Sequence, residues 1–104
     1  MGNVISITRN NDRFKSDMRM IAILEAKMNH LGENISRLEG IIEKFGDRKD
    51  VSAERAKIAK LSEKQDEINA HLYRVLSRYD VNYSGKGYFD VTTKDGKLTR
   101  RFHA

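Results

Sequence analysis

Apolar residues recur along the first half of the chain with the spacing of a coiled-coil seam. From Ile21 onward the steps between them alternate three and four residues without a break. The series is Ile21, Leu24, Met28, Leu31, Ile35, Leu38, Ile42 and Phe45. This alternation places every member on one stripe of an α-helix that packs against another helix. We therefore predict a helix over residues 13–45.

A second series with the same alternation follows the short segment 46–50. It consists of Val51, Glu54, Ile58, Leu61, Gln65, Ile68, Leu72, Val75 and Tyr79. No proline interrupts either series, so we predict a second helix over 51–80, capped by Asp50 or Ser52. Gly46 stands where the end of a helix favours a residue that tolerates positive φ. A tip loop as short as 46–50 makes the two helices antiparallel neighbours.

Folding the chain about this loop brings the two series into register from end to end. Leu38 then faces Ile58, Met28 faces Ile68 and Ile21 faces Val75. Three layers contain a polar residue, and they pair Ile42 with Glu54, Leu31 with Gln65, and Asp17 with Tyr79. Polar residues in a seam usually lower stability and fix the register.

The C-terminal segment 81–104 reads as a β-hairpin. Asp95-Gly96 is a turn signal that makes Phe89 face Phe102 and Asp90 face Arg101 as an ion pair. A three-residue loop with a bulge is the alternative register. An isolated hairpin is marginal in water, so we expect a third strand from residues 3–8 of the N-terminal arm 1–12. The sequence leaves open whether these strands pair within one chain or between chains.

The predicted fold class is mainly α. It is an antiparallel two-helix coiled-coil hairpin with a short N-terminal strand and a C-terminal β-hairpin at the open end, all in a single domain over 1–104. Its core is thin, and several apolar residues lie off the seam. We predict that they bury a second surface in a homo-oligomer, with a dimer favoured, and the predicted oligomer surface consists of Met20, Ile23, Ile41 and Leu76.

The positive charge of the chain is concentrated at its C-terminal end. The formal net charge is +5, and residues 81–104 hold five basic and two acidic residues, whereas both helices are nearly neutral. The candidate nucleic-acid or partner-binding residues are Lys94, Lys97, Arg100, Arg101, Tyr88 and Phe102. Basic side chains neutralise phosphates and aromatic rings stack on bases. Alternatively, the rings form the core of the ribbon and the charges protect its edge.

Motifs for catalysis are missing from the sequence. It holds no cysteine, no nucleophile motif and no glycine-rich phosphate loop, so we predict no enzyme activity, no catalytic residue, no cofactor and no metal. No apolar run approaches the length of about 18 residues that spans a membrane, and we expect a cytoplasmic location.

The function predicted from these features is binding to other proteins. We expect a non-enzymatic helical-hairpin protein of the assembly-factor, chaperone-like or phage- or virus-type host-binding kind. The alternative is a small nucleic-acid-binding protein that uses the basic, aromatic C-terminal hairpin.

Overall fold

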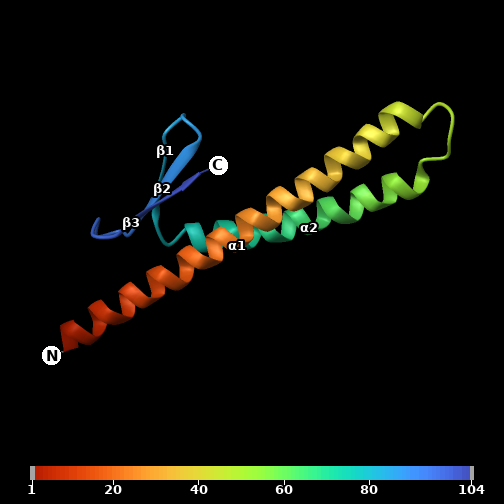
Figure 1. Cartoon of the computed structure of the whole chain (residues 1–104). Helices are drawn as coiled ribbons and strands as arrows, with labels where there is room; N and C mark the ends of the chain where they lie inside the picture. Colours follow the sequence, from red (N-terminus) through yellow and green to blue (C-terminus); the bar gives the residue numbers. More distant parts are fainter. Residues whose placement is uncertain (1, 104) are drawn as a thin grey trace. The chain divides into compact units, whose positions relative to one another are not determined.

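Two long helices connected by a tip loop precede a small sheet at the C-terminus (Figure 1). The computed structural model describes the backbone of residues 2–103 and the side chains of residues 11–103. Helix α1 covers Gly2–Phe45 and helix α2 covers Ser52–Leu76. Strands β1 (Asp80–Tyr83), β2 (Tyr88–Thr92) and β3 (Thr99–His103) follow. The predicted helical hairpin and C-terminal β-hairpin are therefore confirmed.

The predicted N-terminal strand at residues 3–8 is wrong, because this segment belongs to α1. β-branched residues favour strands only where a neighbouring strand is available, and their preference is weak against context. Extending an existing helix costs far less than nucleating one, and no proline blocks the extension. The third place in the sheet is taken by β1, which pairs with β2.

The second helix ends four residues earlier than predicted, at Leu76. The Ser77 hydroxyl donates to the Arg74 carbonyl at 2.7 Å. The backbone N–H groups of Arg78 and Tyr79 reach back only three residues, to carbonyls of the last turn, which tightens the end of the helix. Arg78 and Tyr79 therefore lie in a turn, and the chain enters β1 directly after them.

The chain divides into two compact units, and both helices run through each of them. The first unit contains Met1–Ile23 with Leu72–Ala104, and the second contains Leu24–His71. Whether the two units fold as the single domain predicted over 1–104 stays a prediction.

The second unit is an antiparallel helical hairpin whose seam follows the predicted positions, except at Phe45, which is 39% exposed. Leu31, Leu38 and Val51 are buried. A side chain added at Gly32 would begin 3.7 Å from the Gln65 amide nitrogen, in agreement with the predicted facing of Leu31 and Gln65. Other seam residues are only half-buried: Met28, Ile35, Ile58, Leu61 and Ile68. Two helices alone cover each stripe from one side, so this core stays thin.

The tip of this hairpin is held by local hydrogen bonds. The Asp50 carboxylate accepts the Ser52 backbone N–H at 3.0 Å, and hydrogen bonds from Ser52 lower the pKa of Asp50. The Gly46 N–H donates to the Ile42 carbonyl at 2.8 Å. Gly46 does not adopt a positive φ, contrary to the predicted reason for a glycine here. A Cβ at this position would instead lie 2.6 Å from the Ile42 carbonyl oxygen.

The first unit contains the sheet, with β2 as its central strand. The predicted hairpin register is confirmed, because Phe89 pairs with Phe102 and Asp90 with Arg101. The Asp90–Arg101 ion pair forms at 2.9 Å. The β2–β3 turn is closed by a hydrogen bond from the Gly96 N–H to the Thr93 carbonyl. Gly96, the last residue of this turn, has a positive φ of 76°, which glycine adopts without steric cost.

The core of the first unit combines side chains from both helices and from the sheet. Phe89 and Phe102 stack with ring centroids 5.2 Å apart, and Val91 beside them is fully buried. The helices contribute Phe14, Met18, Ile21, Leu72 and Val75. Tyr79, from the turn after α2, is buried with them. This mixed core positions the side chains of the candidate site.

Gly40, within α1, and Gly46, directly after its last residue, give a matched test of the tip geometry. We expect Gly46→Ala to lower the free energy of unfolding by about 1–3 kcal/mol, because the new Cβ meets a backbone carbonyl that cannot move freely. Gly40→Ala should raise it by about 0.5–1 kcal/mol, because alanine favours the helix and its Cβ meets no other atom within 4 Å. Denaturant titration followed by circular dichroism measures both values.

Equal effects of the two substitutions would contradict this description of the tip. An unchanged stability of Gly46→Ala would show that the chain turns differently after Phe45.

Candidate functional site

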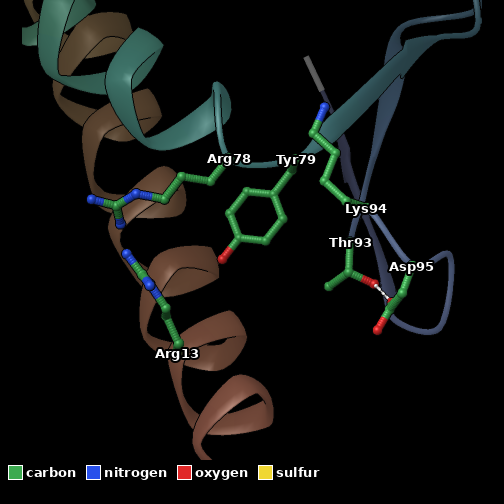
Figure 2. Close-up of a pocket in the computed structure, with 6 residues that line it drawn as sticks. All are labelled: Arg13, Arg78, Tyr79, Thr93, Lys94 and Asp95. Atoms are coloured by element: carbon green, nitrogen blue, oxygen red, sulfur yellow. Dashed lines mark hydrogen bonds between the residues drawn. The ribbon is translucent and has the colours of Figure 1, made fainter. Parts of the chain in front are cut away.

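A pocket of about 330 Å³ in the first unit gathers side chains from three elements (Figure 2). Arg13 comes from α1, Arg78 and Tyr79 come from the turn after α2, and Thr93, Lys94 and Asp95 come from the β2–β3 turn. The early end of α2 creates this arrangement, because it releases Arg78 and Tyr79 from the helix.

A buried polar pair lies beside the pocket. Tyr79 is 9% exposed and Asp17 is 8% exposed. The Tyr79 hydroxyl donates a hydrogen bond to the Asp17 carboxylate, which confirms the predicted facing of these two residues. The ring of Phe14 meets the ring of Tyr79 edge to face, with centroids 5.8 Å apart. Burial, followed by the hydrogen bond to Asp17, raises the pKa of Tyr79 well above its ordinary value.

Arg78 supplies a positive charge to the buried carboxylate. Its Nη1 atom lies 3.3 Å from Asp17 Oδ1 and 3.5 Å from Oδ2. A buried carboxylate is tolerated only when hydrogen bonds and an opposite charge replace water. Asp17 therefore depends on both Tyr79 and Arg78.

The opposite wall of the pocket is the β2–β3 turn. The Thr93 hydroxyl donates to Asp95 at 2.6 Å, and the Lys97 N–H donates to the same carboxylate oxygen at 3.0 Å. These bonds lower the pKa of Asp95. The Lys94 ammonium pairs with Asp80 at 2.8 Å, and Figure 2 shows it pointing away from Arg13 and Arg78.

The predicted nucleic-acid residues do not gather into one surface. Strand alternation places Arg100 and Phe102 on one face of the sheet and Tyr88 and Arg101 on the other. Arg101 also pairs with Asp90, and its guanidinium carbon lies 3.9 Å from the Tyr88 ring centroid.

The remaining members of that set are covered, paired or at the turn. Phe102 is buried under Arg100, whose guanidinium carbon lies 5.0 Å from the ring centroid. Lys94 is paired with Asp80, whereas Lys97 is exposed in the turn. The ring of Phe102 thus belongs to the core of the sheet, as in the alternative interpretation of the sequence, whereas Tyr88 is half-buried on the other face.

The predicted oligomer surface is partly accessible. Ile23 is 50% exposed and Met20 is 37% exposed, whereas Ile41 and Leu76 are half-buried. Each of these residues lies on a helix, outside the predicted seam.

Sequence reasoning missed the basic pocket. The signal that could have found it is Arg13, which stands four residues before Asp17 and so shares its helix face. Predicting α2 through residue 80 hid the contribution of Arg78, because it placed that side chain on a helix surface.

Comparisons of the chain with protein-family models, with curated proteins and with solved structures gave no match. Within the part of the chain that the structure describes, no helix combines the length and the apolar character needed to cross a membrane.

Replacing Tyr79 tests the buried polar pair. We expect Tyr79→Phe to lower the free energy of unfolding at neutral pH by about 1–3 kcal/mol, because Asp17 loses a buried donor. The raised folded-state pKa means that neutral Tyr79 contributes stability below its unfolded pKa of about 10. That contribution is lost as pH rises above about 10. The difference in unfolding free energy between the wild type and Tyr79→Phe should therefore become smaller above that pH.

Tyr83→Phe is the control, because Tyr83 is 76% exposed. Denaturant titrations at a series of pH values measure all three proteins. The account of the pair fails if Tyr79→Phe behaves like Tyr83→Phe at neutral pH, or if its difference from the wild type widens with rising pH.

Proposed function

We propose that this protein is a non-enzymatic helical-hairpin protein that acts by binding other protein surfaces, and that one of its partners is a second copy of itself. The observation that carries this proposal is the half-buried seam of the second unit. A continuous apolar stripe that its own hairpin covers from one side only is typical of helices that pack further partners.

A groove of about 520 Å³ follows this seam on one side of the hairpin. Apolar side chains of Ala26, Leu31 and Ile68 contribute to it. Polar side chains line it as well, from Lys27, His30, Lys64 and Glu67. This mixture supports a copy of the same hairpin as occupant, because the lysines of one copy can pair with Glu67 of the other.

A second copy would turn two helices into a four-helix arrangement with a fuller core. Small chains commonly supplement a thin core in this way. The exposed Ile23 and Met20 support the same proposal, since each is a large apolar side chain in water. A further protein partner, in an assembly, chaperone or host-binding role, would use the same kinds of apolar surface. We place this function in the cytoplasm, which the cysteine-free sequence supports.

Nucleic-acid binding is the second candidate function. It is favoured by Lys97 and Arg100, which are exposed and form no ion pair among the described side chains of residues 11–103. The covered rings of Phe89 and Phe102 and the paired charges of Lys94 and Arg101 favour the first candidate.

Two alanines on the surface of the second unit give a matched test of self-association. Ala26 lines the groove, whereas Ala70 is exposed and does not line it. We expect Ala26→Glu to weaken self-association at least tenfold, because association would bury a large charged side chain where the groove now holds a methyl group. Ala70→Glu adds the same charge and should associate like the wild type.

Light scattering after size exclusion, over a wide concentration range, measures the molar mass of each protein. A wild-type chain that stays monomeric at every concentration would refute self-association. Equal behaviour of the two glutamate variants would refute this groove as the interface.

A further inference from the structure

Arg13 and Arg78 bring two guanidinium groups to the pocket of the first unit, and of the two only Arg78 is paired with a carboxylate among the described residues 11–103. In Figure 2 the guanidinium groups of Arg13 and Arg78 lie close to the same part of α1, on the hydroxyl side of Tyr79. Arg78 reaches Asp17 through Nη1 alone, although a guanidinium has five N–H donors. Arg13 forms no ion pair within the described residues 11–103.

The neighbouring sequence supplies one further acid at the start of the chain, Asp12, which forms no ion pair among the described side chains of residues 11–103. Residues 1–10 contain neither Asp nor Glu. Guanidinium groups pair best with planar anions that accept two hydrogen bonds at once. The spare donors of Arg13 and Arg78, beside an open hollow of about 330 Å³, are suited to a second carboxylate.

We propose that this pocket binds a carboxylate side chain from an acidic segment of a protein partner, held between Arg13 and Arg78. The proposal rests on the protein-binding function and adds the chemistry of the partner at this site. The Tyr79 hydroxyl positions the Asp17 carboxylate, and Asp17 in turn accepts a hydrogen bond from Arg78 Nη1, which directs this guanidinium to the pocket before a ligand arrives.

The pocket favours an acidic side chain over a nucleic-acid strand. Its volume is at the small end of ligand sites and accommodates one or two side chains. The ring of Tyr79 is buried and cannot stack on a base, and Lys94 is directed to Asp80 rather than into the pocket.

The test uses the full-length chain and a short blocked peptide of four glutamates as the probe. NMR spectra record the backbone amides of Tyr79, Thr93 and Asp95 and the arginine Nε–H groups during titration. A four-glutamine peptide, inorganic phosphate and a short single-stranded RNA are titrated in parallel. We expect saturable shifts at the pocket with the glutamate peptide only.

Arg13→Gln is the decisive variant, because Arg13 is exposed and forms no ion pair with Asp17, so the fold should be kept. It should weaken peptide binding about tenfold. Arg19→Gln is the matched control, since it removes the same charge from another exposed position of α1 in the same unit. It should bind the peptide like the wild type.

Four results would overturn the proposal. Equal weakening by Arg13→Gln and Arg19→Gln would mean general charge attraction, and no shift at the pocket would mean no site. Saturation by phosphate without the peptide would mean a free-anion site. Tight RNA binding with shifts spreading to Lys97 and Arg100 would mean the nucleic-acid class. Translational diffusion in the same samples measures self-association. A protein that does not bind the peptide is therefore distinguished from one that does not self-associate through the hairpin.

Discussion

A helix with one apolar stripe is stable in water only when something covers the stripe, and residues 24–71 meet this demand by doubling back. The Asp50 cap and the close turn at Gly46 define where the chain reverses. The reversal also explains why Met1–Ile23 and Leu72–Ala104, far apart in sequence, fall into one unit. The same arrangement limits the core, since two helices leave part of each seam in contact with water. The proposed self-association follows from this deficit.

In the first unit the main energetic cost is the burial of a charge, because the carboxylate of Asp17 lies among apolar side chains. Such a group is tolerated when its hydrogen bonds and charge are matched. Tyr79 and Arg78 provide the match, and both come from the turn that ends α2. Arg13 then adds a charge that Asp17 alone does not balance. Stability and the proposed recognition of an acidic partner therefore depend on the same few side chains.

The sequence predicted what periodicity and turn chemistry control. The heptad series located the half-buried and buried seam, and Asp95-Gly96 fixed the pairing of Phe89 with Phe102. Prediction from the sequence failed where the surrounding structure determines the conformation of a segment. The β-branched residues of 3–8, for example, continue a helix instead of forming a strand. The end of α2 at Leu76 was missed because Val75 and Tyr79 keep the seam spacing past the last helical residue. The basic pocket depends on that end, so it was missed as well.

The central claim is that the chain reverses at residues 46–51 and pairs its own two seams. Nitroxide labels at Ser36→Cys and Lys60→Cys test it directly, because both positions are exposed and the chain has no cysteine of its own. Electron–electron double resonance, in samples diluted with unlabelled protein, measures the distance within one chain. The hairpin predicts about 20 Å or less. A distance near 36 Å, the length of one continuous helix between these residues, would contradict it.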